Sequence, residues 1–178
     1  FTLVFPELKN IHRLKNFNSI KNYVGNSEIL FLSILSIDFK DNHEYFSHKY
    51  KVSNKINDSL SLLGNKFKES MTDKEFFKKN LKNNLYEIGI KNLKILFCLS
   101  LLEKKRISDK EISFFQSIEK ISIPEFPFDG KFLLKKGVQE GKKIGTILNE
   151  AKKIWVKNDF NLSSKDFEKI IKKTTSSS

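Results

Sequence analysis

The sequence predicts an all-α fold of roughly eight to nine helices, and three observations support this fold class. Apolar residues recur every three or four positions over most of the 178 residues, which is the spacing of one face of an α-helix. Only 3 residues are Pro and 7 are Gly, too few to separate many short strands. No segment of the sequence alternates apolar and polar residues as a half-buried strand does.

Four helices are predicted in the first 64 residues, each delimited by a capping residue or a glycine. Pro6 suits the first turn of the first helix, because proline lacks the N–H group that this turn leaves unbonded. Ser27 and Ser53 can cap the second and fourth helices by accepting hydrogen bonds from their first N–H groups. Gly25 is expected to end the first helix, and Gly64 the fourth. The expected spans are 6–24, 27–37, 41 or 42 to 50, and 53–64.

Three further helices are predicted before residue 122. The motifs Thr-Asp-Lys-Glu at 72–75 and Ser-Asp-Lys-Glu at 108–111 match the capping box, in which the first and last side chains accept from free N–H groups. Gly89 is expected to end the helix that the first box opens, and residues 90–103 then form a mostly apolar helix. The expected core draws on Phe31, Leu32, Ile34, Leu35, Phe77, Leu81, Ile95, Leu96, Leu99, Phe115 and Ile118.

Residues 123–128 mark the predicted boundary between a helical body region, 1–122, and a tail region, 123–178. This segment holds two of the three prolines and is expected to be extended, because residues before proline avoid the α conformation. In order, the tail should contain a short helix from Asp129, a turn bracketed by Gly137 and Gly141, a long helix to about Lys157, and a last helix capped by Ser163 or Ser164.

A net charge of +12 suggests a polyanionic partner, nucleic acid first. Composition bias is a second explanation, and it stays open. Of the 33 basic residues, 31 are Lys, the exceptions being Arg13 and Arg106, and Ala151 is the only alanine, as expected from an AT-rich genome. The distribution adds a little to the first explanation, since the net charge rises from +2 over residues 1–64 to +6 over residues 129–178.

The residue types that perform catalysis or bind metals are not grouped in a functional pattern. Cys98 lies in an apolar stretch, where a buried thiol resists forming the reactive thiolate. His43 and His48 are five residues apart and so do not share a helix face, as a metal-binding pair would. The acidic pairs at 73–75 and 109–111 lie at predicted helix starts, where carboxylates favour the helix dipole. We therefore expect no catalytic residue and no metal site in this chain.

No contact with a membrane is expected. The longest apolar run, residues 29–37, is interrupted by serines and is too short to span a bilayer, and the first residues do not resemble a signal peptide. A single unpaired Cys fits a cytoplasmic location best. The chain begins at Phe1 and its only methionine is Met71, so we expect that an N-terminal portion, able to carry the chemistry, has been removed.

The segment from Phe126 to Phe160 is predicted to form two helices joined by a turn that suits a phosphate. Gly137 can adopt the left-handed conformation that ends a helix, and Gly141 can begin the next helix with its N–H groups exposed. Gly145 has no side chain to block close approach. Free N–H groups with nearby lysines form an anion-binding site, but the same pattern fits an ordinary helical hairpin with solvated lysines. The candidate RNA-binding residues are Lys131, Lys135, Lys136, Gly137, Gly141, Lys142, Lys143, Gly145, Lys152 and Lys153.

Trp155 has two possible roles in this segment, packing in the core or stacking on an RNA base. It lies at helical spacing from Ile144 and Leu148. Because aromatic residues at helical spacing usually belong to a core, we expect Trp155 to pack against them rather than stack on a base.

The segment also carries a succession of motifs without gaps: Pro-x-Phe-Pro at 124–127, Gly-x-x-Leu-Leu-x-x-Gly at 130–137, Gly-x-x-Ile-Gly-x-x-Leu at 141–148, then Trp155 and Phe160. This succession resembles the C-terminal region of bacterial CCA-adding tRNA nucleotidyltransferases and poly(A) polymerases of the class II nucleotidyltransferase superfamily. Two weaker upstream matches follow in the family's order, Pro-Glu-Leu at 6–8 and Val-Ser-Asn at 52–54.

The resemblance implies a body and tail that grip the acceptor arm and T-arm of tRNA, with residues 1–24 as the candidate end of the neck. In this family a head with a Gly-Ser turn and an Asp-x-Asp pair, and a neck with Glu-Asp-x-x-Arg, transfer nucleotides using Mg²⁺ and CTP or ATP. None of these motifs occurs in this chain, and Phe132 stands where the family usually has an acidic residue or Asp-Leu. The chain is therefore expected to hold no cofactor and to be inactive alone.

Three functions stay open at this point. The first is that the chain is the body and tail of a CCA-adding enzyme and binds tRNA or other structured RNA. Its other partners would then be the head and neck of the same enzyme. The second is the same role in a bacterial poly(A) polymerase, which body and tail motifs do not distinguish. The third is a helical protein-interaction module with no RNA role, whose charge reflects genomic composition.

Overall fold

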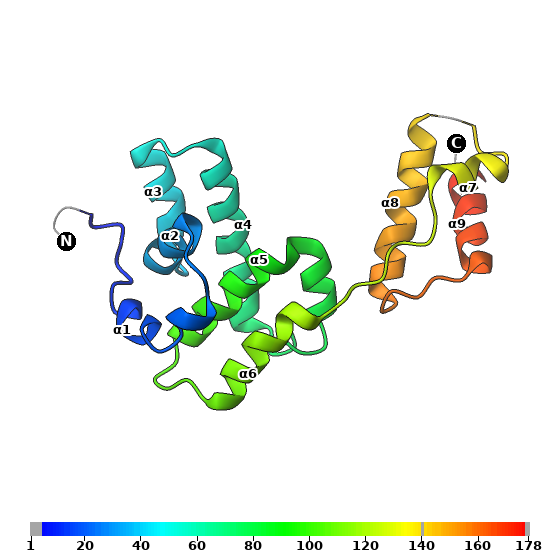
Figure 1. Cartoon of the computed structure of the whole chain (residues 1–178). Helices are drawn as coiled ribbons and strands as arrows, with labels where there is room; N and C mark the ends of the chain where they lie inside the picture. Colours follow the sequence, from blue (N-terminus) through cyan, green and yellow to red (C-terminus); the bar gives the residue numbers. More distant parts are fainter. Residues whose placement is uncertain (1–4, 140, 177–178) are drawn as a thin grey trace. The chain divides into compact units, whose positions relative to one another are not determined.

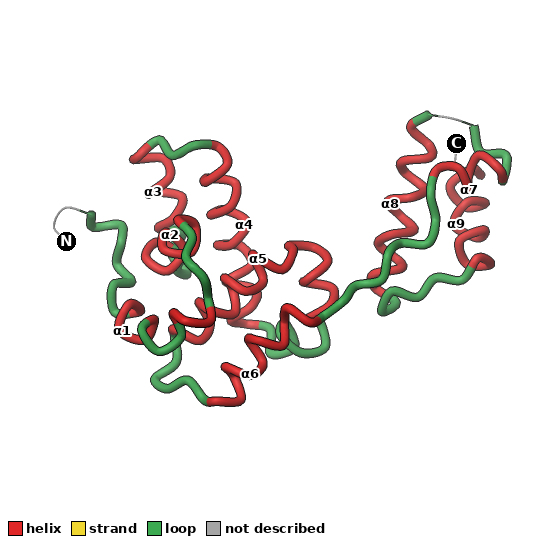
Figure 2. Tube along the Cα trace, in the orientation of Figure 1, coloured by secondary structure: helices red, strands yellow, loops and turns green. Residues whose placement is uncertain are grey.

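The computed structural model describes residues 5–139 and 141–176, and within them every regular element is a helix (Figures 1 and 2). This confirms the predicted all-α class. The chain divides into two compact units, Phe1–Ile121 and Ser122–Ser178, hereafter the N-terminal and C-terminal units. In chain order the described elements are α1 Arg13–Phe17, η1 Lys21–Tyr23, α2 Glu28–Ser36, α3 Asn42–Tyr50, α4 Asn54–Thr72, α5 Leu81–Leu102, α6 Asp109–Ser117, η2 Ile118–Lys120, α7 Gly130–Lys135, α8 Lys142–Lys157 and α9 Ser164–Ser176.

The core of the N-terminal unit forms where α4 packs against α5, α3 and α2. Leu60, Leu63 and Phe67 of α4 are fully buried and recur every three or four residues, so they lie on one helix face. The second half of α5 supplies further fully buried residues, including Leu96 and Cys98. Burial raises the pKa of the Cys98 thiol to about 12, which confirms the prediction of a buried thiol that resists ionisation.

Serine side chains cap three helices of this unit at the predicted positions. Ser27 accepts from a first-turn N–H of α2 at 3.2 Å, and Ser53 does the same for α4 at 3.4 Å. Ser108 and Glu111 form a complete capping box at the start of α6, because each also accepts from the backbone N–H of the other. These local signals place the starts of α2, α4 and α6.

Residues 6–12 do not form the start of a helix, so the prediction based on Pro6 is wrong, and the first α-helix is the short α1. Tertiary contacts explain the difference. The side-chain amide of Asn10 donates to the carbonyl oxygens of Leu35 at 3.3 Å and Ile37 at 3.1 Å, near the end of α2. The segment is therefore held as turns against α2 instead of continuing as a helix.

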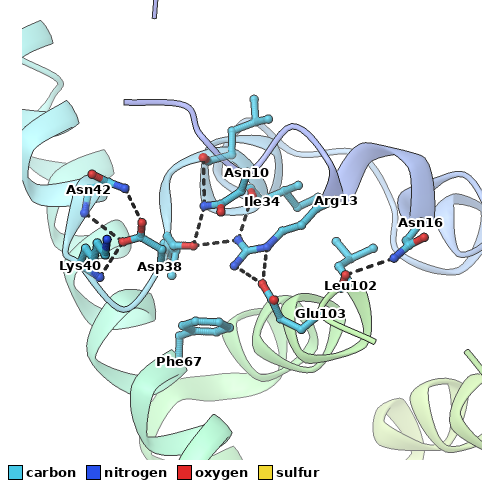
Figure 3. A network of polar contacts seen from close by, with 12 residues as sticks. Asn10, Arg13, Asn16, Ile34, Asp38, Lys40, Asn42, Phe67, Leu102 and Glu103 are labelled. Carbon is cyan, nitrogen blue, oxygen red and sulfur yellow. Dashed lines mark hydrogen bonds and ion pairs between the residues drawn. The ribbon is translucent and has the colours of Figure 1, made fainter. Parts of the chain in front are cut away.

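Arg13 extends this attachment from α1 and is only 2% exposed (Figure 3). Its Nη1 donates to the carbonyl oxygens of Ile34 at 2.9 Å and Ile37 at 2.7 Å, and its Nε donates to Glu103 at 2.6 Å. The guanidinium carbon also lies 5.4 Å from the centroid of the Phe67 ring. One cation thus satisfies carbonyl groups that α2 leaves free at its C-terminus and links α1 to α2, α4 and the end of α5.

Gly64 does not end a helix as predicted, because α4 continues through it to Thr72. A Cβ atom at this position would lie 2.2 Å from Nε2 of His43, a residue of α3 that is 0% exposed. The glycine therefore allows α3 and α4 to approach each other closely. Neither ring nitrogen of His43 has a hydrogen-bond partner among the described residues, and burial lowers the pKa of the imidazole.

The capping box predicted at 72–75 is also wrong. Thr72 is the last residue of α4, where its hydroxyl donates to carbonyls of the preceding turn. The Asp73 carboxylate then accepts from the backbone N–H two residues later and from a side-chain amide seven residues later. The chain therefore continues as turns, and α5 begins only at Leu81. Gly89 interrupts α5 with φ of +75°, in line with its predicted role, but helix resumes directly after it.

Most of the predicted core residues are buried, and the exceptions lie on helix α2 and before α5. Phe31 is 37% exposed, Leu32 and Leu35 are half-buried, and Phe77 is half-buried while its neighbour Phe76 is buried. The α2 helix is apolar on most faces, so periodicity alone could not select the face that packs. The predicted core residues that are buried are Ile34, Leu81, Ile95, Leu96, Leu99, Phe115 and Ile118.

The C-terminal unit has its own core between α7, α8 and α9. Leu133, Ile147 and Phe167, one from each helix, are fully buried. Trp155 of α8 is 1% exposed, and its ring centroid lies 4.8 Å from that of Phe160 and 5.3 Å from that of Phe126. The predicted burial of Trp155 is therefore confirmed, with two phenylalanines as its aromatic neighbours.

Candidate nucleic-acid interface

The turn between α7 and α8 begins with a left-handed glycine, as the sequence predicts. Gly137 has φ of +82°, and its N–H donates to the Leu134 carbonyl at 3.0 Å. The Val138 N–H donates to the Leu133 carbonyl at 3.1 Å, which completes the Schellman motif that closes many helices. Leu133 and Val138 are buried in one cluster, so the motif also fixes the turn to the core.

Gly141 precedes α8 with φ of +136°, in a region that residues with a side chain rarely adopt. The helix then begins with Lys142 and Lys143, with no acidic residue in its first turn and no side-chain cap from Gly141. Serine or aspartate side chains cap α2, α4, α6 and α7. Among the described residues no side chain accepts from the first-turn N–H groups of α8, although the Ile144 N–H donates to the Gly141 carbonyl at 3.1 Å. Free N–H groups at the start of a helix are the groups to which anions bind.

The lysines of the predicted site differ in what they contact. Lys136 donates to Glu168 of α9 at 2.6 Å, and this contact lowers the pKa of the Glu168 carboxyl. Lys152 is half-buried, and its Nζ lies 5.7 Å from the centroid of the Phe126 ring. These two lysines therefore also serve the packing of their own unit. The other five are exposed and form no ion pair with a described residue: Lys131, Lys135, Lys142, Lys143 and Lys153.

One face of α8 brings part of the predicted site together. Ile147, Ala151 and Trp155 define the buried face, and the helical repeat places Lys142 and Lys153 directly opposite them. A Cβ atom at the nearby Gly145 would meet nothing within 4 Å, so this face is unobstructed there. Three further exposed residues of this face were not among the predicted site residues, although helical spacing from Lys142 points to them: Thr146, Asn149 and Lys157.

The described residues contain one group of potential metal ligands, and it lies in the N-terminal unit. Ligand atoms of Asp41, His43 and Glu44 lie within 4.8 Å of one another. Lys68, however, donates to both carboxylate oxygens of Asp41, at 2.6 and 2.7 Å, and His43 packs against Gly64. This group therefore does not match the paired carboxylates that hold Mg²⁺ in two-metal phosphoryl transfer.

The arrangement in the C-terminal unit offers first-turn N–H groups, five exposed lysines and an open glycine, a combination suited to the oxygens of a phosphodiester backbone. Within the residues that the structure describes, no helix is long and apolar enough to cross a membrane. No protein-family model and no curated protein matches this chain.

Proposed function

We propose that this chain binds tRNA through its phosphates and forms the body and tail of a cytoplasmic CCA-adding tRNA nucleotidyltransferase. The turn between α7 and α8 carries the proposal. Gly137 and Gly141 adopt positive φ at the positions where the family pattern has glycine, and Lys142 and Lys143 follow at the open end of α8. A phosphate bound there would meet helix N–H groups and two ammonium groups together.

The use of lysine supports binding that does not depend on base sequence. Lysine presents a compact charge, whereas the planar fork of arginine is the group that recognises base edges in pairs of hydrogen bonds. The exposed face of α8 from Lys142 to Lys157 extends about 22 Å along the helix, long enough to contact more than one phosphate. Recognition by shape and phosphate suits an enzyme that accepts every tRNA.

In this proposal the chain positions the 3′ end of tRNA, and a head and neck outside these residues perform nucleotide transfer with Mg²⁺ and CTP or ATP. The sequence holds no Asp-x-Asp pair. Incubation of the purified chain with tRNA, CTP, ATP and Mg²⁺ should therefore give no incorporation, and incorporation above background would contradict the assignment.

The second candidate is the same role in a bacterial poly(A) polymerase, because both enzymes share the motifs at 124–160. The complete enzyme distinguishes them. A CCA-adding enzyme should add one CCA end and stop, whereas a poly(A) polymerase should extend generic RNA with many adenylates.

The experiment that tests RNA binding is a gel shift with tRNA at salt concentrations from about 50 to 300 mM. Counterion release requires the affinity to fall steeply with salt if phosphates are the contact. The variant Lys142→Ala/Lys143→Ala should bind more weakly and with a shallower salt dependence. Lys165→Ala/Lys169→Ala, which removes the same charge from α9, should change both less. Affinity that does not change with salt would favour a protein-interaction module instead.

A further inference from the structure

A cavity of about 530 Å³ lies in the N-terminal unit, between the end of α4, the turns before α5, the second half of α5, and α6. Three phenylalanine rings line it. The ring centroid of Phe97 lies 5.0 Å from that of Phe77 and 5.0 Å from that of Phe114, with interplanar angles of 73° and 65°. Phe97 is buried, but Phe77 and Phe114 are half-buried and Met71 beside them is 37% exposed, so the apolar surface is open to a ligand.

Basic residues surround the opening without serving the fold. Lys74, Lys78 and Lys110 line the cavity, are exposed, and form no ion pair with a described residue. The fourth lysine at this cavity, Lys104, is different, because it is bonded to Glu111. Three ammonium groups are therefore available at the edge of an aromatic surface.

The acidic residues at the cavity are already engaged. Glu103 pairs with Arg13, and Glu111 accepts from Lys104 and from the N–H of Ser108. The remaining acid, Asp73, accepts from backbone and side-chain amides of the adjoining turns. The cavity edge therefore has a surplus of positive charge.

We propose that this cavity binds a nucleoside monophosphate unit, either a free nucleotide or an unpaired nucleotide of an RNA. The planar base would contact the rings of Phe77, Phe97 and Phe114, since aromatic rings hold bases of any sequence. The phosphate would lie at the lysines of the edge. The volume is in the range of small-molecule sites, and an uncharged apolar ligand would leave the surplus of positive charge uncompensated.

This proposal does not rest on the proposed tRNA contact of α8, because the cavity belongs wholly to the other unit. The chain itself provides separate probes for the two units. Met71 is the only methionine and lines the cavity, and Trp155 is the only tryptophan and lies in the C-terminal unit.

The test is a titration of the full chain, labelled with ¹³C at the methionine methyl, with AMP. The Met71 methyl signal should shift with added AMP until it saturates. The variant Met71→Leu removes this signal, so any methionine signal that remains comes from an initiator methionine kept on the expressed chain. Adenosine and ribose 5-phosphate should each bind more weakly, because each lacks one of the two contacts. A short adenine oligonucleotide that binds more tightly than AMP identifies unpaired RNA as the source, and weaker or equal binding identifies the free nucleotide.

Charge-matched variants test the position of the phosphate. Lys74→Gln/Lys78→Gln/Lys110→Gln should weaken AMP binding by at least about fivefold, from three lost charge contacts. As the control, Lys21→Gln/Lys51→Gln/Lys55→Gln removes three exposed lysines of the same unit that do not line the cavity, and it should leave the Met71 titration unchanged. An unmoved Met71 signal at millimolar AMP, equal weakening by both variants, or displacement of AMP by decanoate at lower concentration would each overturn the proposal.

Discussion

Arg13 of the N-terminal unit and the lysines at the start of α8 in the C-terminal unit use positive charge in opposite ways. Among the described residues of the N-terminal unit, six basic side chains form ion pairs, and Arg13 is almost completely buried. In the C-terminal unit Lys136 and Lys169 form ion pairs with described residues, and five lysines of the candidate interface face solvent. Net charge by itself therefore does not identify a binding surface, because the same residue types hold helices together at some positions and stay exposed at others.

The difference is sharpest at Arg13, one of two arginines in a chain with 33 basic residues. Its guanidinium bonds two carbonyl groups and a carboxylate at once, which the single ammonium of lysine does less well.

Arg13→Met should lower the free energy of unfolding of the N-terminal unit by about 3–5 kcal/mol, because it leaves Glu103 without its cation and removes a donor from two carbonyl groups at the end of α2. Urea unfolding followed by far-ultraviolet circular dichroism measures this loss. The fluorescence of Trp155, which reports the C-terminal unit, should keep its transition midpoint. A loss below about 1 kcal/mol would mean that Arg13 does not hold the unit together.

Gly137→Val should destabilise the C-terminal unit by about 1–3 kcal/mol, because a β-branched residue is forced into a left-handed conformation at the Schellman turn. The Trp155 fluorescence transition measures the change. Gly137→Asn is the matched variant, since asparagine tolerates this conformation, and it should recover most of the loss. Equal effects of Val and Asn would show that backbone strain is not the cause.

Gly64→Ala and Gly145→Ala form a pair across the units. Alanine favours a helix over glycine by about 1 kcal/mol, so Gly145→Ala should stabilise α8, where a Cβ meets nothing. Gly64→Ala should instead destabilise by about 1–3 kcal/mol, because its Cβ would overlap the buried ring of His43. Thermal melts of both variants measure the two signs, and stabilisation by Gly64→Ala would refute the close packing of α3 on α4.

His43 makes the N-terminal unit sensitive to acid. Burial lowers the pKa of its imidazole below the ordinary value of 6.5, although nearby Asp41 and Glu44 oppose the shift. Below pH 6.5 His43 of the unfolded chain binds a proton, whereas His43 of the folded chain stays neutral until a lower pH. The free energy of unfolding is therefore at its full value above pH 6.5 and falls as the pH decreases, by at most about 1.4 kcal/mol per pH unit. Urea midpoints between pH 5.5 and 7.5 should show this slope, and His43→Phe should remove it. Parallel curves for the two proteins would exclude His43 as the cause.

Features that depend on near neighbours in sequence were predictable. The capping box at Ser108 and the turn at Gly137 involve residues within five positions, and both occur as expected. Thr72 has the same local pattern as Ser108 but ends a helix, and Gly64 is set by His43, 21 positions earlier. The partners of Arg13 lie 21, 24 and 90 positions away. Sequence periodicity does not report such distant contacts, so it could not place residues 6–12 or reveal the buried arginine.

At the candidate interface, too, only the features set by near neighbours in sequence were predictable. The glycines and the lysines beside them followed from the sequence, and so did the burial of Trp155. The contacts of Lys136 with Glu168 and of Lys152 with Phe126 could not be predicted, because these partners are 32 and 26 positions away in the sequence. These contacts give Lys136 and Lys152 a role in the packing of their own unit, while the other candidate lysines are exposed.

The most direct test of the contrast between the units is to measure thermal stability and tRNA affinity on the same variants. Lys142→Ala/Lys143→Ala should keep its melting temperature, because exposed unpaired lysines contribute little to folding, and should lose several-fold in affinity at low salt. Trp155→Ala should lose melting temperature first, by the cost of about 3–5 kcal/mol for emptying a core site. The opposite pattern, a destabilised lysine variant that binds normally and a stable Trp155→Ala that does not bind, would mean that core and binding surface have been exchanged.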